Sequence, residues 1–291
     1  MNARRRVTAV ERTPPGTLRS WWPALVLIAA GIAVYANGLG APFILDDEDT
    51  ILRNPFITSV WPLQEAMRAP AQSSAAGRPL VSLSFAISRA LSGGLSPSGF
   101  RIWNLAILIA TAVLLAGIVH RTIRRADVNA LHPKRLALAA ALMWLLHPLN
   151  SEVVGYVTQR TESMMGMFYL LTLYATIRSI DTPAQARRWT SIAIVACAAG
   201  MGCKESMVTA PLMVFLYDVV FGAGSIAAAL KQRRGLYGGL AATWILLLLF
   251  NLAAPRSGSA GFATATPVWT YLMNQGVMIV IYLRLTIWPI R

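Results

Sequence analysis

Residues 45–54 read Leu45-Asp46-Asp47-Glu48-Asp49-Thr50-Ile51-Leu52-Arg53-Asn54 and directly follow an apolar run that ends near Leu39. Four of the 12 acidic residues are consecutive here, in a chain of 291 residues whose formal net charge is +14. An acidic turn just outside a membrane span is often only a solvated cap. The rest of the chain decides between a cap and a functional site.

The composition is that of an integral membrane protein. Hydrophobic residues make up 56% of the chain and charged residues 13%, whereas about 25% of residues are charged in an ordinary soluble domain. The basic residues fall mostly in short connections between apolar runs, as membrane orientation requires, so we expect a lipid bilayer and no nucleic acid as partner. Cys197 and Cys203 match neither a zinc motif nor a disulfide framework, and we assign them no function.

The apolar runs predict an all-α, polytopic transmembrane protein with about eight spans. Residues 1–20 read as a basic cytoplasmic tail, and the first span, from 21 to about 39, reads as an anchor rather than a cleaved signal peptide. Residues 40–100 form a long first outer loop that carries the acidic motif, with surface helices predicted at 60–68 and 80–91. The further spans are predicted at 101–120, 136–149, 162–178, 189–202, 206–222, 236–253 and 269–289.

Charge distribution predicts the orientation. With the amino terminus inside, cytoplasmic segments hold 16 of the 26 Lys and Arg residues and outer segments hold eight, which favours a cytoplasmic amino terminus. Eight of the 12 acidic residues fall in the outer segments. Because the basic residues alone set the topology, this gathering of acids on one face is an independent indication of a functional surface.

Charged side chains from other segments are predicted on the same outer face. They are Arg78 before a predicted surface helix, His147, Glu152, Arg160 and Glu162 around the turn between the third and fourth spans, and Lys204 and Glu205 in the next outer turn. Each one alone reads equally well as a cap, a local ion pair or an interfacial anchor. Charges at the mouth of a span are costly unless they are paired or solvated, so together they predict a polar cavity at the membrane surface.

Such a cavity suits sugar transfer from a polyprenyl-phosphate sugar. Arg78, Arg160 and Lys204 are cations that fit a lipid-borne phosphate. A carboxylate beside them can take the proton of an acceptor hydroxyl while the cations stabilise the leaving phosphate, and a single displacement inverts the anomeric carbon. No cofactor is certain, because the acid cluster could instead hold a divalent metal through oxygen ligands. The residues alone leave base and metal ligand both open.

Seven short motifs follow one another along the chain. They are Tyr35-Ala36-Asn37-Gly38-Leu39, Phe43-Ile44-Leu45-Asp46-Asp47, Arg78-Pro79-Leu80, His147-Pro148, Ser151-Glu152-Val153-Val154, Arg160-Thr161-Glu162 and Lys204-Glu205. Their order and spacing over about residues 30–291 resemble the membrane half of the transmembrane and tetratricopeptide-repeat protein O-mannosyltransferases, of the GT-C class. The predicted membrane domain, residues 21–291, is therefore expected to be GT-C-like.

The resemblance implies a donor of dolichyl- or undecaprenyl-phosphate mannose type and a Ser/Thr hydroxyl of an exported protein as acceptor. It also implies a catalytic centre at Asp46 and Asp47, of which we take Asp47 as the expected general base. Arg78, Arg160 and Lys204 would hold the phosphate, Glu152, Glu162 and Glu205 would orient these cations or contact sugar hydroxyls, and His147 is a weaker candidate. The expected location is a bacterial inner membrane with a periplasmic site, or the ER membrane with a luminal site.

The sequence departs from the pattern of that family in two respects, and two other functional classes stay open. The chain has no 34-residue repeat, so either it is a fragment or the repeats are absent, and Gln159-Arg160 stands where the family has Gly-Arg. The alternative class is a non-catalytic transporter or flippase of lipid-linked sugar, which would place charges near the midplane and often show repeated halves. The predicted spans are nearly free of internal charge, with Asp218 and Arg284 as exceptions near their ends. An inactive scaffold is the third reading.

Overall fold

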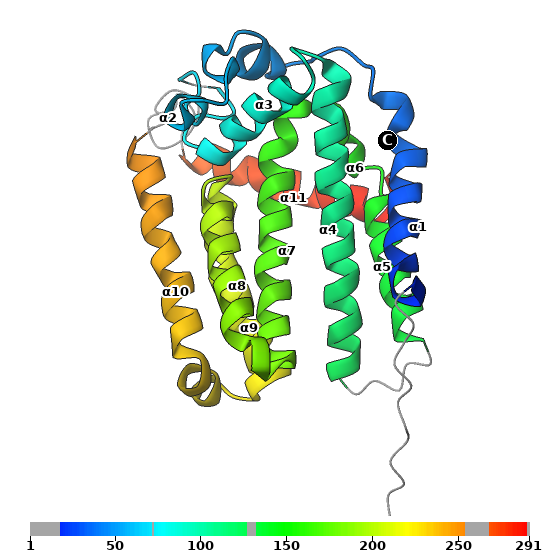
Figure 1. The fold of residues 1–291 in the computed structure, drawn as a ribbon, viewed down its shortest axis with the longest axis vertical. Coiled ribbons are helices and arrows are strands. Elements are labelled where there is room, and N and C mark those ends of the chain that lie inside the picture. The colour runs from blue at the N-terminus through cyan, green and yellow to red at the C-terminus, as the bar shows by residue number, and fades with distance from the viewer. Residues whose placement is uncertain (1–17, 72, 127–131, 254–267, 290–291) are drawn as a thin grey trace, which may run out of the picture.

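The computed structural model describes residues 18–71, 73–126, 132–253 and 268–289 (Figure 1). Over these residues the protein consists of helices and turns without β-strands, so the predicted all-α fold is confirmed. The bundle helices are α1 (Leu18–Tyr35), α4 (Pro97–Arg125), α5 (Pro133–Leu145), α7 (Arg160–Asp181), α8 (Ala186–Met201), α9 (Ala210–Asp218), α10 (Ile226–Ala253) and α11 (Val268–Ile287). Three further helices, α2 (Leu63–Ala66), α3 (Pro79–Leu91) and α6 (Asn150–Gly155), lie in the connections between them.

Each predicted span overlaps one of the bundle helices. Within the described residues, four helical segments are long and apolar enough to cross a membrane: Trp21–Gly38, Pro97–Arg125, Glu205–Ala223 and Ile226–Ala253. Helix α11, where the last span was predicted, lies across the direction of α4 and α7 in Figure 1. The membrane class is therefore supported by the apolar helices, whereas the count of about eight spans is not confirmed.

Helix α7 occupies the middle of the bundle. It packs against α4 on one side and α8 on the other, while α4 also contacts α1 and α5, and α8 contacts α10. Proline stands at the first turn of α3, α4 and α5, where a missing N–H costs no intrahelical hydrogen bond. The Ser96 side chain accepts a hydrogen bond from the backbone N–H of Gly99 and so caps α4.

The bundle has two chemically different ends. We call one the acidic end; it comprises residues 36–71, 73–96, 146–159 and 202–209 and includes α2, α3 and α6 (Figure 1). We call the other the basic end; it comprises residues 119–126, 132–136, 177–190 and 219–235. Within the described residues, these ends match the faces that the charge count predicts to be outer and cytoplasmic.

The first long loop is a packed cap on the acidic end of the bundle. A buried cluster joins it to α4 and α7, and this cluster includes Ile51, Ile57, Val81, Phe85, Phe100, Val157 and Met164. The helix predicted at 80–91 is α3, although its Val81 and Phe85 are fully buried rather than lying on a surface. The helix predicted at 60–68 shortens to the single turn α2, which follows Pro62. The loop thus has its own core, which fixes the acidic motif.

Candidate functional site

Asp47 is fully buried and ties the first loop to the turn after α6. Its carboxylate accepts hydrogen bonds from the backbone N–H groups of Thr158 at 2.9 Å, Ile44 at 3.2 Å and Val157 at 3.4 Å. It also interacts electrostatically with the guanidinium groups of Arg101 and Arg160. These contacts hold the acidic motif against the ends of α4 and α7, which gives Asp47 the geometry of a positioning residue.

Asp46 points the other way and is exposed. Its Oδ2 accepts a hydrogen bond of 2.7 Å from Ser74 Oγ, and its backbone N–H donates to the Tyr156 hydroxyl at 3.2 Å. The Tyr156 hydroxyl also interacts with this carboxylate. Of the two adjacent acids, Asp46 is the exposed one, so an incoming hydroxyl can reach its carboxylate and not that of the buried Asp47.

A chain of contacts connects Asp46 to cations from two other segments. Ser74, the partner of Asp46, also accepts a hydrogen bond of 2.9 Å from Arg78 Nη1 through its backbone carbonyl. Arg78 Nη2 forms an ion pair of 3.0 Å with Glu205, and the neighbouring Lys204 pairs with Glu162 of α7. The structure thus brings five predicted site residues to one part of the acidic end: Asp46, Arg78, Glu162, Lys204 and Glu205.

Backbone contacts fix this arrangement. The N–H of Leu80 donates to the carbonyl of Gly202 at 3.2 Å, which docks the start of α3 onto the turn that carries Lys204 and Glu205. Arg78 has only 10% of its side chain exposed, whereas Glu205 has 42% exposed. The guanidinium therefore lies at the base of the site, and the Glu205 carboxylate lies nearer its opening.

A cavity of about 380 Å³ adjoins Arg78 between the first loop and the end of α10. Its lining combines two guanidinium side chains with apolar groups: Arg68, Arg78, Phe56, Met67 and Phe250, together with Ala69, Gly77, Pro79 and Ala253. Cations beside an apolar wall suit a ligand that carries both a phosphate and a hydrocarbon chain.

Arg160 is fully buried at the start of α7, and its donors are used inside the protein. Nε donates to Asn104 Oδ1 at 2.7 Å, Nη1 to Ser88 Oγ at 2.6 Å and to the Ser84 carbonyl at 3.1 Å, and Nη2 to the Phe100 carbonyl at 2.7 Å. The guanidinium carbon also lies 4.7 Å from the centre of the Phe85 ring. This geometry joins α3, α4 and α7 and does not favour the predicted role of Arg160 in holding a phosphate.

His147 and Glu152 lie in a separate part of the acidic end, beside α11. His147 Nε2 is 3.0 Å from the carbonyl oxygen of Thr286, and Glu152 accepts a hydrogen bond of 2.9 Å from Gln159. Glu152 also lines a cavity of about 460 Å³ together with Tyr282 and Arg284 of α11. None of these contacts connects the two residues directly to Arg78 or Lys204.

Two buried residues of α4 belong to the site and were missed in the sequence. Arg101 donates to the carbonyls of Leu39, Ala41, Pro42 and Gly155. Asn104 accepts from Arg160 and donates to the carbonyls of Val153 and Val157. A polar pair three residues apart, near the entrance of an apolar run, was the available signal, because charge inside a span needs partners.

The acidic motif does not present a ready set of metal ligands. Asp47 turns inward, Asp46 contacts Ser74, and Glu48 and Asp49 both pair with Arg53. Within the described parts of the chain, no three His, Cys, Asp or Glu side chains are grouped so as to hold a metal ion. A divalent metal at this motif would require these side chains to rearrange.

Burial gives Asp47 a testable pH signature. It raises the pKa of the Asp47 carboxyl above the ordinary 3.8, although the three backbone donors oppose the shift. A carboxyl whose pKa is higher in the folded than in the unfolded state stabilises most at low pH, and this stability is lost as the pH rises through the folded-state pKa. We expect the melting temperature of the wild type, measured relative to Asp47→Asn, to fall as the pH rises above about 4.

The measurement is thermal unfolding in detergent. Asp49→Asn serves as the control, because its carboxylate lies in the same loop and is 69% exposed. The assignment would be contradicted if the melting temperature of the wild type rose relative to that of Asp47→Asn with increasing pH.

Comparison with known proteins gives this geometry a context. The protein O-mannosyl-transferase Tmtc2 of Drosophila melanogaster is 29% identical over 286 residues, which cover 91% of this chain and 29% of the relative. Human protein O-mannosyl-transferase TMTC4 is 25% identical over 291 residues, covering 90% of this chain and 39% of the relative. Drosophila Tmtc1, also named a protein O-mannosyl-transferase, is 31% identical over 207 residues, 67% of this chain and 22% of the relative.

The fold defines a class, a polytopic α-helical protein of the membrane. Within that class, the chain is a homologue of the TMTC protein O-mannosyl-transferases over most of its length, which confirms the resemblance that the motifs indicated. The chain spans between 22% and 39% of the length of these relatives. No family model matches the chain. No solved structure matches it either.

Proposed function

We propose that this chain forms the membrane part of a glycosyltransferase that moves mannose from a polyprenyl-phosphate donor to a Ser or Thr hydroxyl of an exported protein. The observation that carries the proposal is the convergence of Asp46, Arg78, Lys204 and Glu205 from three segments at the acidic end. The names of the relatives point to the same reaction class. The active face would be the non-cytosolic one, periplasmic or luminal.

The proposed step is a single displacement at the anomeric carbon. The acceptor oxygen forms a bond to this carbon while the bond from the carbon to the donor phosphate oxygen breaks, and the lipid phosphate leaves with the electron pair. Asp46 takes the proton of the acceptor hydroxyl, because its carboxylate is exposed where that of Asp47 is buried. Base and leaving group lie on opposite faces of the sugar, so the configuration inverts.

Arg78 is the proposed contact of the leaving phosphate. Its guanidinium is held by Ser74 and Glu205 and lines the cavity that also contains Arg68 and apolar side chains. A preorganised cation beside the leaving oxygen stabilises the charge that develops there. Lys204 and Glu162 form the neighbouring pair and would contact sugar hydroxyls or neutralise the second phosphate oxygen.

The decisive experiment is a transfer assay in membranes. Full-length protein is incubated with polyprenyl-phosphate mannose and a Ser/Thr peptide, and the glycopeptide and the released lipid phosphate are both measured. Mannosyl transfer that survives chelation supports the direct base mechanism, whereas transfer that requires a divalent metal reassigns the acidic motif to metal binding. Movement of the lipid-linked sugar across the membrane without glycosidic cleavage would replace the proposal by the flippase reading.

Arg78→Lys tests the phosphate contact. Lysine keeps the charge but cannot contact Ser74 and Glu205 with two separate nitrogens as the fork does. We expect the KM for the lipid donor to rise by about tenfold, with a smaller change in the KM for the peptide. Arg53→Lys is the matched control, because Arg53 is an exposed, ion-paired arginine of the same loop. Equal KM values for the donor in wild type and Arg78→Lys would remove Arg78 from the donor site.

A further inference from the structure

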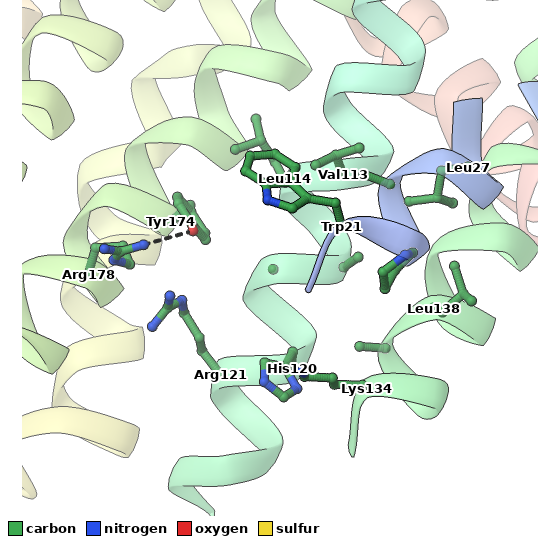
Figure 2. Close-up of a pocket in the computed structure, with 15 residues that line it drawn as sticks. Trp21, Leu27, Val113, Leu114, His120, Arg121, Lys134, Leu138, Tyr174 and Arg178 are labelled. Atoms are coloured by element: carbon green, nitrogen blue, oxygen red, sulfur yellow. Dashed lines mark hydrogen bonds between the residues drawn. The ribbon is translucent and has the colours of Figure 1, made fainter. Parts of the chain in front are cut away.

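A second cavity, of about 550 Å³, lies between α1, α4, α5 and α7 (Figure 2). It lies at the basic end of the bundle, opposite the acidic end (Figure 1). One part of its wall is apolar and includes Leu27, Val113 and Leu138. The other part is polar and cationic, with Arg121 of α4, Lys134 of α5 and Arg178 of α7 as its cations and the His120 ring beside them. The cavity therefore has a charged compartment next to an apolar one.

The cationic compartment contains polar atoms without a protein partner. Arg178 Nε and His120 Nδ1 are buried and make no hydrogen bond. Arg178 is nevertheless held in place, since its Nη1 donates to the Tyr174 hydroxyl at 3.3 Å and its guanidinium carbon lies 4.3 Å from the centre of the Trp189 ring. The guanidinium of Arg178 is therefore held in a fixed position beside the cavity.

The charge of this compartment is positive after its ion pairs are counted. Among the described residues, no carboxylate lines the cavity. The nearby Asp181 pairs with Arg121 at 2.7 Å, and it also pairs with Arg125 at 2.6 Å. One carboxylate is thus shared by two arginines, while Lys134 and Arg178 add two further positive charges. The compartment attracts an anion.

The location of the cavity indicates a membrane lipid as the source of that anion. The cations lie where four bundle helices reach the basic end, which is the face predicted to meet the cytoplasmic headgroups. Trp21 of α1 lines the same cavity and is 67% exposed, as expected of an aromatic side chain at the interface between membrane and water. Basic pockets between transmembrane helices on this side bind phosphate-bearing lipid headgroups.

We infer that this cavity binds the phosphate of an anionic membrane lipid through Arg178, Lys134 and Arg121, with an acyl chain against Leu27, Val113 and Leu138. The contacts are non-covalent, and the bound lipid joins α1 and α5 to α4 and α7. The site is independent of the proposed transfer reaction, because it uses none of the residues around Asp46. Its failure and the failure of the transfer proposal are therefore separate results.

The test is a melting-temperature titration of the purified full chain in neutral detergent. The probes are phosphatidylglycerol, phosphatidylcholine and inorganic phosphate. We expect phosphatidylglycerol to raise the melting temperature, and phosphatidylcholine and inorganic phosphate at the same concentration to leave it unchanged. Equal stabilisation by phosphatidylcholine overturns the charge recognition, and equal stabilisation by inorganic phosphate overturns the lipid as the source of the anion.

Three variants locate the effect. Lys134→Gln combined with Arg178→Gln should weaken the apparent affinity for phosphatidylglycerol at least about tenfold, whereas Arg135→Gln, next to Lys134 but outside the cavity, should match the wild type. Val113→Trp fills the apolar side of the cavity and should abolish the response while all the cations remain. If the double variant does not fold, Lys134→Gln and Val113→Trp decide, because both native side chains are exposed. A wild-type response in Val113→Trp and in the lysine variant contradicts the site.

Discussion

Asp46→Asn is expected to reduce mannosyl transfer by at least about 100-fold, the contribution of a positioned general base. The amide has nearly the shape of the carboxylate and keeps an oxygen that accepts the hydrogen bond from Ser74 Oγ. It cannot take a proton from the acceptor hydroxyl. Membrane insertion and the melting temperature should therefore stay close to those of the wild type, and the loss should appear in kcat.

Two neighbouring carboxylates provide the comparison. Asp49→Asn changes an exposed carboxylate of the same loop that pairs with Arg53, and it should retain transfer. Asp47→Asn should lower the melting temperature as well as activity, because its carboxylate binds the backbone of Val157 and Thr158. If instead Asp46→Asn is active and Asp47→Asn is inactive at unchanged stability, Asp47 is the base, as the motif originally indicated.

Arg160→Lys is expected to have the largest effect on stability. The substitution leaves acceptors such as Asn104 Oδ1 and the Phe100 carbonyl without their donors inside the bundle. Disrupting a buried charged network of this kind costs about 3–5 kcal/mol, which corresponds to a fall of about 10 °C in the melting temperature for a chain of this size. Thermal unfolding in detergent measures this fall.

Arg188→Lys is the control for Arg160→Lys, because Arg188 is an exposed arginine of α8. Its melting temperature should match that of the wild type. If Arg160→Lys has the melting temperature of the wild type but has lost affinity for the lipid donor, Arg160 belongs to the donor site. The melting temperature and the donor affinity together thus distinguish an arginine that stabilises the fold from one that contacts the substrate.

Most of the helices could be predicted from the sequence, since apolar runs of sufficient length leave few alternatives. The cap of short helices was harder to predict. Its α3 shows the spacing of a surface helix, yet Val81 and Phe85 are buried against Phe100 of α4, a contact between segments that periodicity cannot reveal. Helix α11 was predicted to be a span, yet it lies across the direction of α4 and α7. An apolar run of span length does not determine the direction in which its helix lies.

The candidate site was predictable as a set but not in its individual roles. The charged residues predicted on one face suggested that Arg78, Lys204 and Glu205 lie near one another, because opposite charges at a membrane surface tend to pair, and the structure pairs Arg78 with Glu205 and Lys204 with Glu162. Which of two adjacent acids faces inward depends on the π-helical turn that follows Asp47, and short-range patterns carry no signal for such a turn. Sequence also cannot distinguish an arginine that contacts substrate from one, such as Arg160, that is saturated by internal acceptors.

The clamp made by Arg101 has a consequence for biosynthesis. Its guanidinium holds the carbonyls of Leu39, Ala41 and Pro42, all of which leave the ribosome about 60 residues before Arg101 itself. The first long loop, which caps the acidic end, therefore cannot reach its final structure until α4 has been inserted beside α1. Expression of residues 36–96 as an excised fragment would leave those carbonyls without their native partner, so the cap is a product of membrane assembly rather than a module that folds in advance.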